Sequence, residues 1–267
     1  MNNQPIGIFD SGMGGLTVVK EVIKLLPNED IVYFGDTARV PYGPKSQDTI
    51  IRFSIENILF LLGHKVKIII IACNTSSSVA LHIAERNFKV PILGVIKPGA
   101  IEAVRVTKNK KIGIIGTRTT IKSGAYKKEI KKISEDIKVY GESCPLFVPL
   151  VEEGWLKEPV SEEIARCYLA PFRKLGVDTI VLGCTHYPLL KPLIKKVVGN
   201  GISLVDSAQQ VARQAKEVLA QQGLTANRKT GRAKIKFFVS DEPENFSVQG
   251  RKFLGVNLNN VKKVSNV

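Results

Sequence analysis

The chain has 267 residues, of which 44% are hydrophobic and 24% are charged, and its formal net charge is +15. These proportions are typical of a globular protein with a substantial core, and they exclude a disordered chain. The longest apolar run, residues 66–72, contains Lys67 and is too short to span a bilayer; a strand-like segment begins at Ile6, which leaves no room for a signal peptide. We therefore expect a cytoplasmic protein with no membrane partner.

Short apolar segments alternate with longer amphipathic segments along the chain. The expected strands are residues 6–9, 31–34, 68–72, 92–95, 111–115, 138–141, 179–182, 203–205 and 235–239. The expected helices are residues 17–26, 46–62, 76–88, 97–106, 119–133, 161–174, 188–198, 207–222 and 242–254. The strands are unbroken apolar runs, which indicates mainly parallel sheets with helices on both faces. The predicted fold class is α/β.

Two pairs of segments indicate an internal repeat. Residues 6–24 align with residues 112–132, and KVKIIIIACNTSSSVAL aligns with GVDTIVLGCTHYPLL at a similar offset. We therefore expect two similar domains related by pseudo-symmetry, the first formed by residues 1–97 plus 207–267 and the second by residues 98–206. The helix that returns the chain to the first domain would be capped by Asp206 or Ser207.

The four cysteines fall into two groups. None has CxxC spacing or paired histidine ligands, so neither a zinc site nor a disulfide is expected. Cys144 and Cys167 are interpreted as small structural residues. Cys73 and Cys184 each lie where a strand gives way to a helix, and a helix N-terminus lowers the pKa of a thiol. Two such units facing each other would hold one thiol on each side of a shared cleft, with His186 either packed as a neutral ring or acting beside Cys184.

The glycine-rich stretch DSGMGGLTV, residues 10–18, differs from a dinucleotide-binding turn. Thr17 occupies the position of the third glycine, and Asp10 would repel a pyrophosphate. The glycines instead favour a tight turn whose N–H groups face a carboxylate at a helix N-terminus. Asp10 itself either caps the following helix or belongs to the site.

Two opposed thiols limit the chemistry. A hydrolase needs one nucleophile, a base and an oxyanion hole, and a redox pair needs its sulfur atoms within bonding distance. Two thiols that flank a carbon acid can instead remove a proton from one face and return one to the other face. That reaction inverts a stereocentre and requires the two groups to be in opposite protonation states.

The net charge has two interpretations. Basic residues cluster in KNKK (108–111), KKEIKK (127–132) and NRKTGRAKIK (227–236), without interleaved aromatics or a nucleic-acid-binding motif. Such runs usually form a solvated surface, so a nucleic-acid partner is not expected, and a basic surface also attracts an anionic small substrate. A basic binding protein without enzymatic activity is the alternative.

Five segments, GIFDSGMGGLTV, YFGDTARVPYG, ACNTSSS, PLVEEGW and GCTHYPLL, resemble the signature segments of bacterial glutamate racemases, in the aspartate/glutamate racemase superfamily. The resemblance runs in order from Ile6 to the helix at Ser207. It implies a cofactor-independent enzyme with no metal, which interconverts L- and D-glutamate, supplies D-glutamate for peptidoglycan and forms a homodimer. It leaves open a related enzyme acting on aspartate and a secondary effect on DNA gyrase. With no N-terminal extension before Ile6, it implies no activation by a peptidoglycan precursor.

The resemblance also assigns residues. Cys73 and Cys184 would be the two acid/base thiols, assisted by Asp10 and His186, and Glu152 fits the further assisting carboxylate better than Glu153. The substrate-binding positions would be Asp10, Ser11, Tyr42, Gly43, Asn74, Thr75, Thr117, Thr120, Thr185 and His186. Asp36, in the same motif as Tyr42, either acts at the site or holds that loop.

Overall fold

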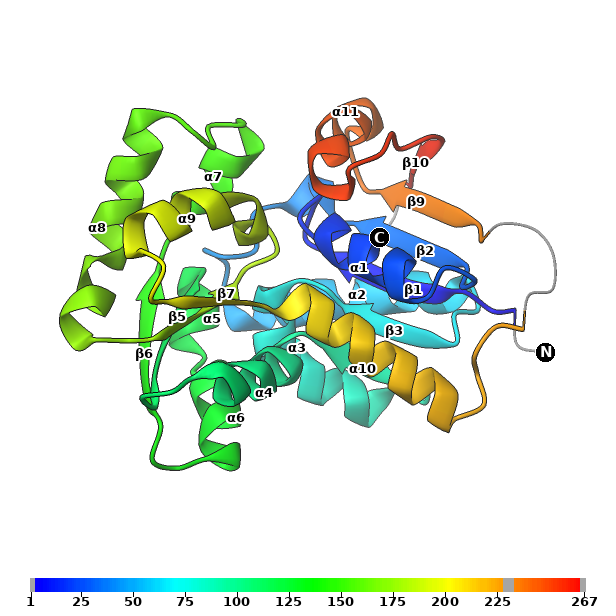
Figure 1. Ribbon diagram of the computed structural model, residues 1–267. Coiled ribbons are helices and arrows are strands. Elements are labelled where there is room, and N and C mark those ends of the chain that lie inside the picture. The colour runs from blue at the N-terminus through cyan, green and yellow to red at the C-terminus, as the bar shows by residue number, and fades with distance from the viewer. Residues whose placement is uncertain (1–2, 228–232, 265–267) are drawn as a thin grey trace.

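The fold contains two parallel β-sheets, as a computed structural model of residues 3–227 and 233–264 shows (Figure 1). The first sheet has the order β10-β9-β2-β1-β3-β4, with β1 (Ile6–Asp10), β2 (Ile31–Gly35), β3 (Ile68–Ile71), β4 (Ile92–Gly94), β9 (Ile235–Val239) and β10 (Val261–Lys263). The second has the order β6-β5-β7-β8, with β5 (Lys111–Gly116), β6 (Lys138–Ser143), β7 (Thr179–Gly183) and β8 (Ser203–Asp206). The α/β prediction is confirmed.

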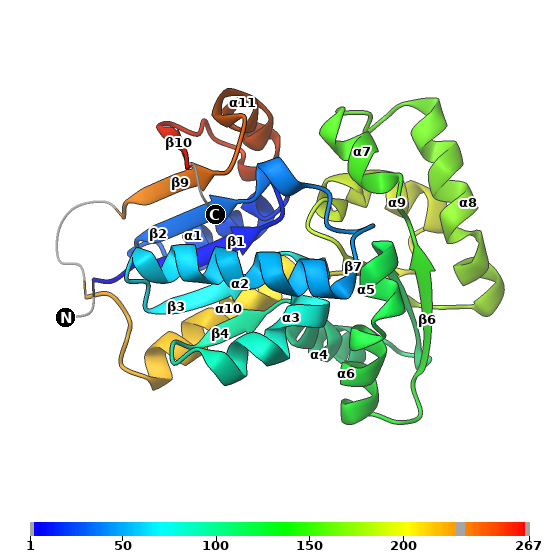
Figure 2. The same cartoon turned by 180° about the vertical axis from the view of Figure 1, so that it is seen from behind.

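Helices cover both faces of the first sheet. One face packs on α1 (Leu16–Leu25), α10 (Ser207–Gln221) and α11 (Pro243–Leu254), and the other on α2 (Gln47–Gly63) and α3 (Asn74–Asn87), as the opposite views in Figures 1 and 2 show. Because helices cover both faces of the sheet, the sequence of β3 is apolar throughout. Ile68 and Ile70 belong to the α1 side of the core, whereas Ile69 and Ile71 belong to the α2 side. Successive side chains of a strand point to opposite faces, so a doubly covered strand must be apolar at every position.

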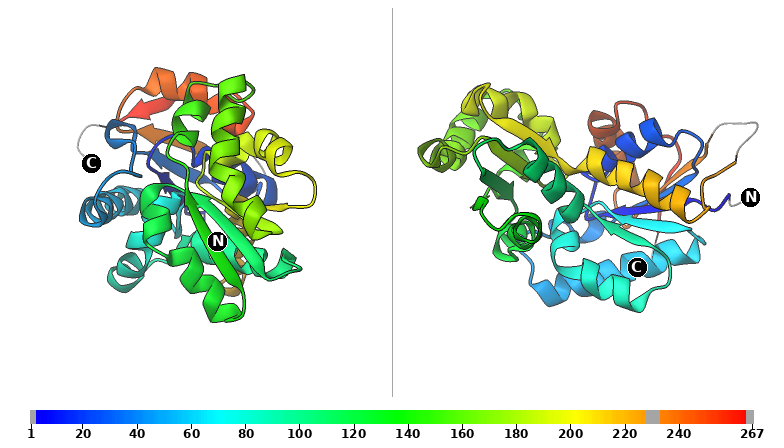
Figure 3. Two further views of the ribbon diagram at one scale, coloured as in Figure 1. Left: turned by 90° about the vertical axis from the view of Figure 1, so that its left-hand side faces the viewer. Right: turned by 60° about the horizontal axis from the view of Figure 1, so that its bottom comes forward.

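The second sheet is covered in the same way. One face packs on α4 (Ile96–Val106) and α6 (Ala125–Ile133), and the other on α7 (Phe147–Glu152), α8 (Pro159–Leu175) and α9 (Lys191–Val198) (Figure 3). The order β6-β5-β7-β8 repeats the order β2-β1-β3-β4. The internal repeat is therefore a repeat of topology, and β3 and β7, which precede the two cysteines of interest, occupy equivalent places.

The second sheet contains only strands between residues 111 and 206, and after it α10 carries the chain back to β9, which pairs with β2. The division into residues 1–97 plus 207–267 and residues 98–206 stays a prediction. Asp206 caps α10, since its Oδ1 accepts a hydrogen bond from the Ala208 N–H at 2.9 Å. No helix within the described residues is long and apolar enough to cross a bilayer.

Two predictions about helices and one about a cysteine were wrong. The helix expected at 119–133 is two helices, α5 (Arg118–Lys122) and α6, because Gly124 adopts the left-handed conformation with φ 64° between them. The helix expected at 188–198 begins as a 3₁₀ turn at Tyr187–Leu190 and continues as α9. Cys167 is exposed on α8 rather than buried, whereas Cys144 is fully buried as predicted.

Three short elements were not predicted: the 3₁₀ turn Thr37–Arg39, helix α7 and strand β10.

The basic clusters at 108–111 and 127–132 lie mostly at the surface, where Lys110 pairs with Asp136 and Lys132 with Glu129. Residues 228–232 of the third cluster lie outside the described residues.

Candidate active site

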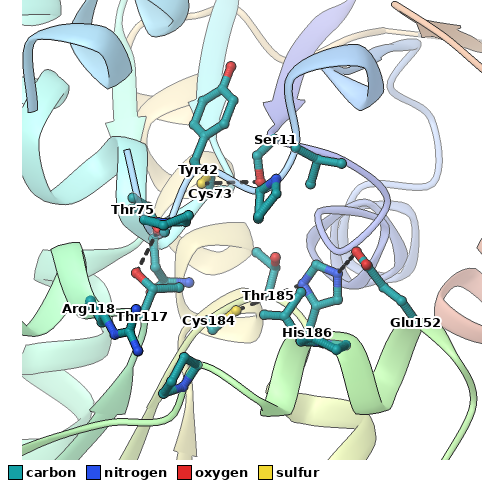
Figure 4. A pocket seen from close by; sticks show the side chains of 18 residues that line it. Ser11, Tyr42, Cys73, Thr75, Thr117, Arg118, Glu152, Cys184, Thr185 and His186 are labelled. Atoms are coloured by element: carbon teal, nitrogen blue, oxygen red, sulfur yellow. Dashed lines mark hydrogen bonds and ion pairs between the residues drawn. The ribbon is translucent and has the colours of Figure 1, made fainter. Parts of the chain in front are cut away.

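The carboxyl ends of β1, β3, β5 and β7 open on one cavity of about 360 Å³. In open α/β sheets ligands bind at this edge of the strands. Most of the site residues predicted from sequence line the cavity, namely Ser11, Tyr42, Gly43, Cys73, Asn74, Thr75, Thr117, Glu152, Cys184, Thr185 and His186. Asp10 and Thr120 do not line it but hydrogen-bond to residues that do. Cys73 and Cys184 project into this cavity from opposite walls (Figure 4).

Cys73 is the N-cap of α3, and a buried thiol serves there as the capping group. Its Sγ accepts a hydrogen bond from the Ser76 N–H at 3.5 Å and donates one to Ser11 Oγ at 3.7 Å. Burial raises the pKa of the Cys73 thiol to about 11, and the nearby Asp10 adds to the rise. The thiol therefore carries its proton at neutral pH.

Cys184 directly follows β7 and belongs to a chain of three polar groups. Its Sγ lies 3.8 Å from His186 Nδ1, and His186 Nε2 lies 3.0 Å from Glu152 Oε1 on α7 (Figure 4). Burial alone would lower the pKa of His186, but hydrogen bonds to Cys184 and Glu152 outweigh it and raise that pKa to about 10. The imidazole is thus a cation at neutral pH, with Cys184 on one side and a carboxylate on the other. Glu153, the less favoured candidate, is exposed.

Asp10 lies outside the cavity lining and connects the turn after β1 to the Cys184 loop. Its carboxylate accepts hydrogen bonds from the Gly12 N–H at 3.1 Å and from the Thr185 hydroxyl at 3.3 Å. Burial raises the pKa of Asp10, and the charge of His186 opposes that rise. The N-cap of α1 is Gly15, so Asp10 is not a helix cap.

The turn after β1 lies so close to the loop that follows β7 that a side chain would not fit at Gly14. A Cβ placed on Gly14 would lie 2.3 Å from Thr185 Oγ1 and 2.5 Å from His186 Nδ1. The glycine-rich stretch therefore serves close packing against the Cys184 loop. This contact explains the motif without a nucleotide.

Three threonines form a hydroxyl cluster on the wall opposite Glu152. Thr75 Oγ1 lies 2.9 Å from Thr117 Oγ1 and 3.4 Å from Thr120 Oγ1, and the last two are 3.0 Å apart. Beside the cluster, Asn74 Oδ1 accepts a hydrogen bond from Tyr126 at 2.8 Å. Carbonyl and carboxylate oxygens of a ligand are suitable partners for such hydroxyl and amide donors.

Comparisons with known proteins agree with this arrangement. Residues 6–215 match the sequence profile of the Asp/Glu/hydantoin racemase family. The chain is 50% identical to the glutamate racemase of Geobacter metallireducens over 97% of this chain and 96% of the relative, and 48% identical to that of Chlorobaculum tepidum over 98% and 97%. The chain belongs to the glutamate racemase family.

Solved structures of glutamate racemases have the same fold. The RacE1 isoform of Bacillus anthracis superposes with a TM-score of 0.95 at 36% identity, covering 99% of this chain and 98% of that one. The Francisella tularensis glutamate racemase, solved in complex with D-glutamate, gives a TM-score of 0.93 at 39% identity with the same coverage. The two-domain racemase fold is thereby confirmed.

In this member of the glutamate racemase family, Asp36 contacts several parts of the loop at 36–44 and lies outside the cavity lining. Its buried carboxylate accepts hydrogen bonds from Arg39 Nε at 2.6 Å, from Ser240 Oγ at 3.0 Å and from the Tyr42 hydroxyl. The Tyr42 hydroxyl consequently points away from the cavity (Figure 4). These contacts support the structural interpretation of Asp36.

Sequence reasoning missed several residues that line the racemase cavity: Val40, Pro41, Pro44, Arg118, Pro145, Val148 and Pro149. All but two of them lie within or next to a recognised segment. Arg118 stands between two predicted residues, Thr117 and Thr120, and Pro145 lies four residues before PLVEEGW. Adjacency to those segments was the available signal. Six of the seven are apolar or proline side chains, which carry no chemistry of their own, so residue type alone did not single them out; Arg118 is the exception.

Proposed function

We propose that this protein is a cofactor-independent glutamate racemase that interconverts L- and D-glutamate by proton transfer between two thiols. The observation that carries the proposal is the placement of Cys73 and Cys184 on opposite walls of one cavity (Figure 4). One sulfur must accept the α-proton while the other supplies a proton to the opposite face.

The environments of the two thiols differ in the way that this reaction requires. Cys73 holds its proton, because burial raises its pKa to about 11. A thiolate at Cys184 would be stabilised by the imidazolium of His186, 3.8 Å from its sulfur. The Cys184 thiolate removes the α-proton, leaving a carbanion, and Cys73 then gives its own proton to the other face. The reverse reaction exchanges the two roles.

Substrate binding follows from the polar groups around the thiols. The hydroxyls of Thr75, Thr117 and Thr120 and the main chain of Gly43 would hold carboxylate groups. Ser11, Asn74, Thr185 and the carboxylate of Asp10 would bind the region of the ammonium and α-carboxylate. Donors fixed in a site that excludes water stabilise the charge that develops in the carbanion. The hydroxyl of Tyr42 is engaged by Asp36, so its contribution would come from its ring and main chain.

The cellular role follows from the family. We propose that the protein acts in the cytoplasm, as a homodimer, to supply D-glutamate for peptidoglycan. Nucleic acid is not expected as a partner, and this stays a prediction.

The test is racemisation in heavy water. The purified protein is incubated with L-glutamate, and with L-aspartate for comparison, in deuterated buffer, and optical rotation and α-deuterium are followed. We expect loss of rotation with deuterium incorporation for glutamate. Activity without added pyridoxal phosphate, by a colourless protein, would support independence from that cofactor.

Single substitutions test the contribution of each thiol to catalysis. We expect Cys73→Ala and Cys184→Ala each to lower kcat by about 10²- to 10⁴-fold, the usual contribution of a positioned acid or base, with an unchanged circular dichroism spectrum. Cys167→Ala is the matched control, because that thiol is exposed on α8. Near-wild-type turnover in either active-site variant would exclude the two-thiol scheme.

A further inference from the structure

One charged side chain that lines the cavity has no partner of opposite charge within ion-pair distance. Three charged residues of the described chain line it: Arg118, Glu152 and His186. Glu152 and protonated His186 form an ion pair at 3.0 Å, so their charges offset each other. Arg118 forms no ion pair with any described residue, so its positive charge is the unpaired one in the lining.

Arg118 lies on the side of the cavity that carries the threonine hydroxyls. It is the first residue of α5, directly after Thr117, and Figure 4 shows it beside Thr117 and across from Glu152. The residue is exposed, and its guanidinium forms no ion pair and donates no hydrogen bond to any other described residue. Its charge is therefore available to a ligand approaching the cavity.

We propose that Arg118 is a specificity-determining residue that draws an amino acid with a second carboxylate into the cavity. This inference rests on the proposed function and extends it to the selection of the substrate. An α-amino acid with one extra carboxylate carries a net charge of one negative unit at neutral pH, and the unpaired guanidinium of Arg118 is a suitable partner for its second carboxylate. A charge at the rim acts on the encounter and on initial binding more than on the chemical step.

The experiment compares Arg118→Ala, Arg118→Lys and Arg118→Glu in steady-state racemisation of L-glutamate. An exposed ion pair contributes little, so we expect Arg118→Ala to raise KM about two- to fivefold with kcat unchanged. Arg118→Lys, which keeps the charge, restores the wild-type KM, and Arg118→Glu raises KM further. The difference between wild type and Arg118→Ala shrinks as ionic strength rises from about 20 mM to about 500 mM, because salt screens exposed charges.

Lys122→Ala and Lys122→Glu are the matched controls. Lys122 is exposed on the same short helix but does not line the cavity, so the net charge changes equally without a change at the site. An equal rise of KM in the Lys122 variants, a fall in kcat alone or a KM that does not respond to Arg118→Ala would overturn the inference while leaving the proposed function intact. Failure of the unaltered protein to racemise glutamate would overturn the proposed function, and this inference with it.

Discussion

At the scale of single residues, the carboxylate of Glu152 contributes, after the Cys184 sulfur, to the raised pKa of His186. It accepts a hydrogen bond from His186, whose pKa is raised to about 10 from an ordinary value of 6.5. In the proposed two-thiol mechanism, a cationic imidazole stabilises a sulfur that alternates between thiol and thiolate. In the proposed mechanism, the neighbouring carboxylate therefore acts on the reaction through His186.

We expect Glu152→Gln to lower the pKa of His186, because the variant removes a negative charge and keeps a polar side chain of the same size. The basic limb of the pH–kcat/KM profile then moves to lower pH. At its optimum, kcat/KM falls about 10- to 100-fold, as for loss of a hydrogen bond between charged groups. An NMR titration of the His186 ring measures the same pKa directly.

Glu153→Gln is the control, since Glu153 is exposed.

The direction in which stability depends on pH follows from the raised pKa of His186. Its contribution to the free energy of unfolding is complete below pH 6.5 and is lost as the pH rises through about 10. In Glu152→Gln the loss begins at lower pH. An unchanged His186 titration would contradict the assigned role.

At the scale of elements, the loop at 36–44 is held by groups distant in sequence. Asp36 connects Arg39 and Tyr42, within the loop, to Ser240 after β9, and Thr37 Oγ1 donates a hydrogen bond to Asp241 O at 2.5 Å. This loop supplies residues 40–44 of the cavity wall. Its position therefore depends on the last part of the chain as well as on its own sequence.

We expect Asp36→Asn to raise KM for glutamate about tenfold, with a smaller change in kcat. The amide removes the negative charge that Arg39 and the Tyr42 hydroxyl share, and hydrogen bonds to a charged group contribute about 1.5–3 kcal/mol. A displaced wall weakens substrate and transition state alike, which raises KM rather than lowering kcat. Steady-state kinetics and the thermal midpoint are measured together.

Asp48→Asn supplies the comparison, because Asp48 is exposed in the first turn of α2. A fall in kcat at constant KM in Asp36→Asn would instead place Asp36 in the chemical step.

Element boundaries show where sequence patterns stop being sufficient. The run 119–133 has helical periodicity throughout, yet the chain turns at Gly124, whose positive φ separates α5 from α6. Glycine is compatible with either outcome, so only packing of α5 against α3 and of α6 against α4 determines the break. Strand β10 is three residues long and is a strand because β9 offers it an edge.

At the scale of the whole molecule, a buried ion pair joins the core to the segment after α10. Lys67 Nζ lies 2.5 Å from Glu29 Oε2, and the two side chains are 1% and 2% exposed. Lys67 also donates to Leu224 O at 2.8 Å, and Glu29 accepts from the Ala226 N–H at 2.7 Å. The pair therefore fixes chain segments that are far apart in sequence, at a distance from the cavity lining.

We expect Lys67→Met to lower the free energy of unfolding by about 3–5 kcal/mol, because it leaves a buried carboxylate without its cation. The double variant Lys67→Met/Glu29→Leu recovers much of the loss, since an apolar pair of similar volume can replace a buried ion pair. Urea denaturation measures both, and kcat/KM well below the unfolding temperature stays at the wild-type value. Lys263→Met, which breaks the exposed pair with Asp241, is expected to change little.

The sequence by itself determined the α/β class, the repeat and the positions of Cys73 and Cys184. These features are local: apolar runs of strand length, amphipathic segments and polar residues at the point where a strand ends. Parallel strands align their carboxyl ends, so residues that follow β3 and β7 were bound to lie at sheet edges. The prediction of paired thiols needed nothing more than that rule and the repeat.

Only the tertiary structure decided which groups act on one another. The contact of His186 with Glu152 joins residues 34 positions apart, and the contact of Asp36 with Ser240 joins residues 204 positions apart. Their pairing depends on how helices and loops pack around two sheets, and no local pattern encodes it. The same holds for Arg118, whose guanidinium is unpaired because no described residue places a carboxylate against it.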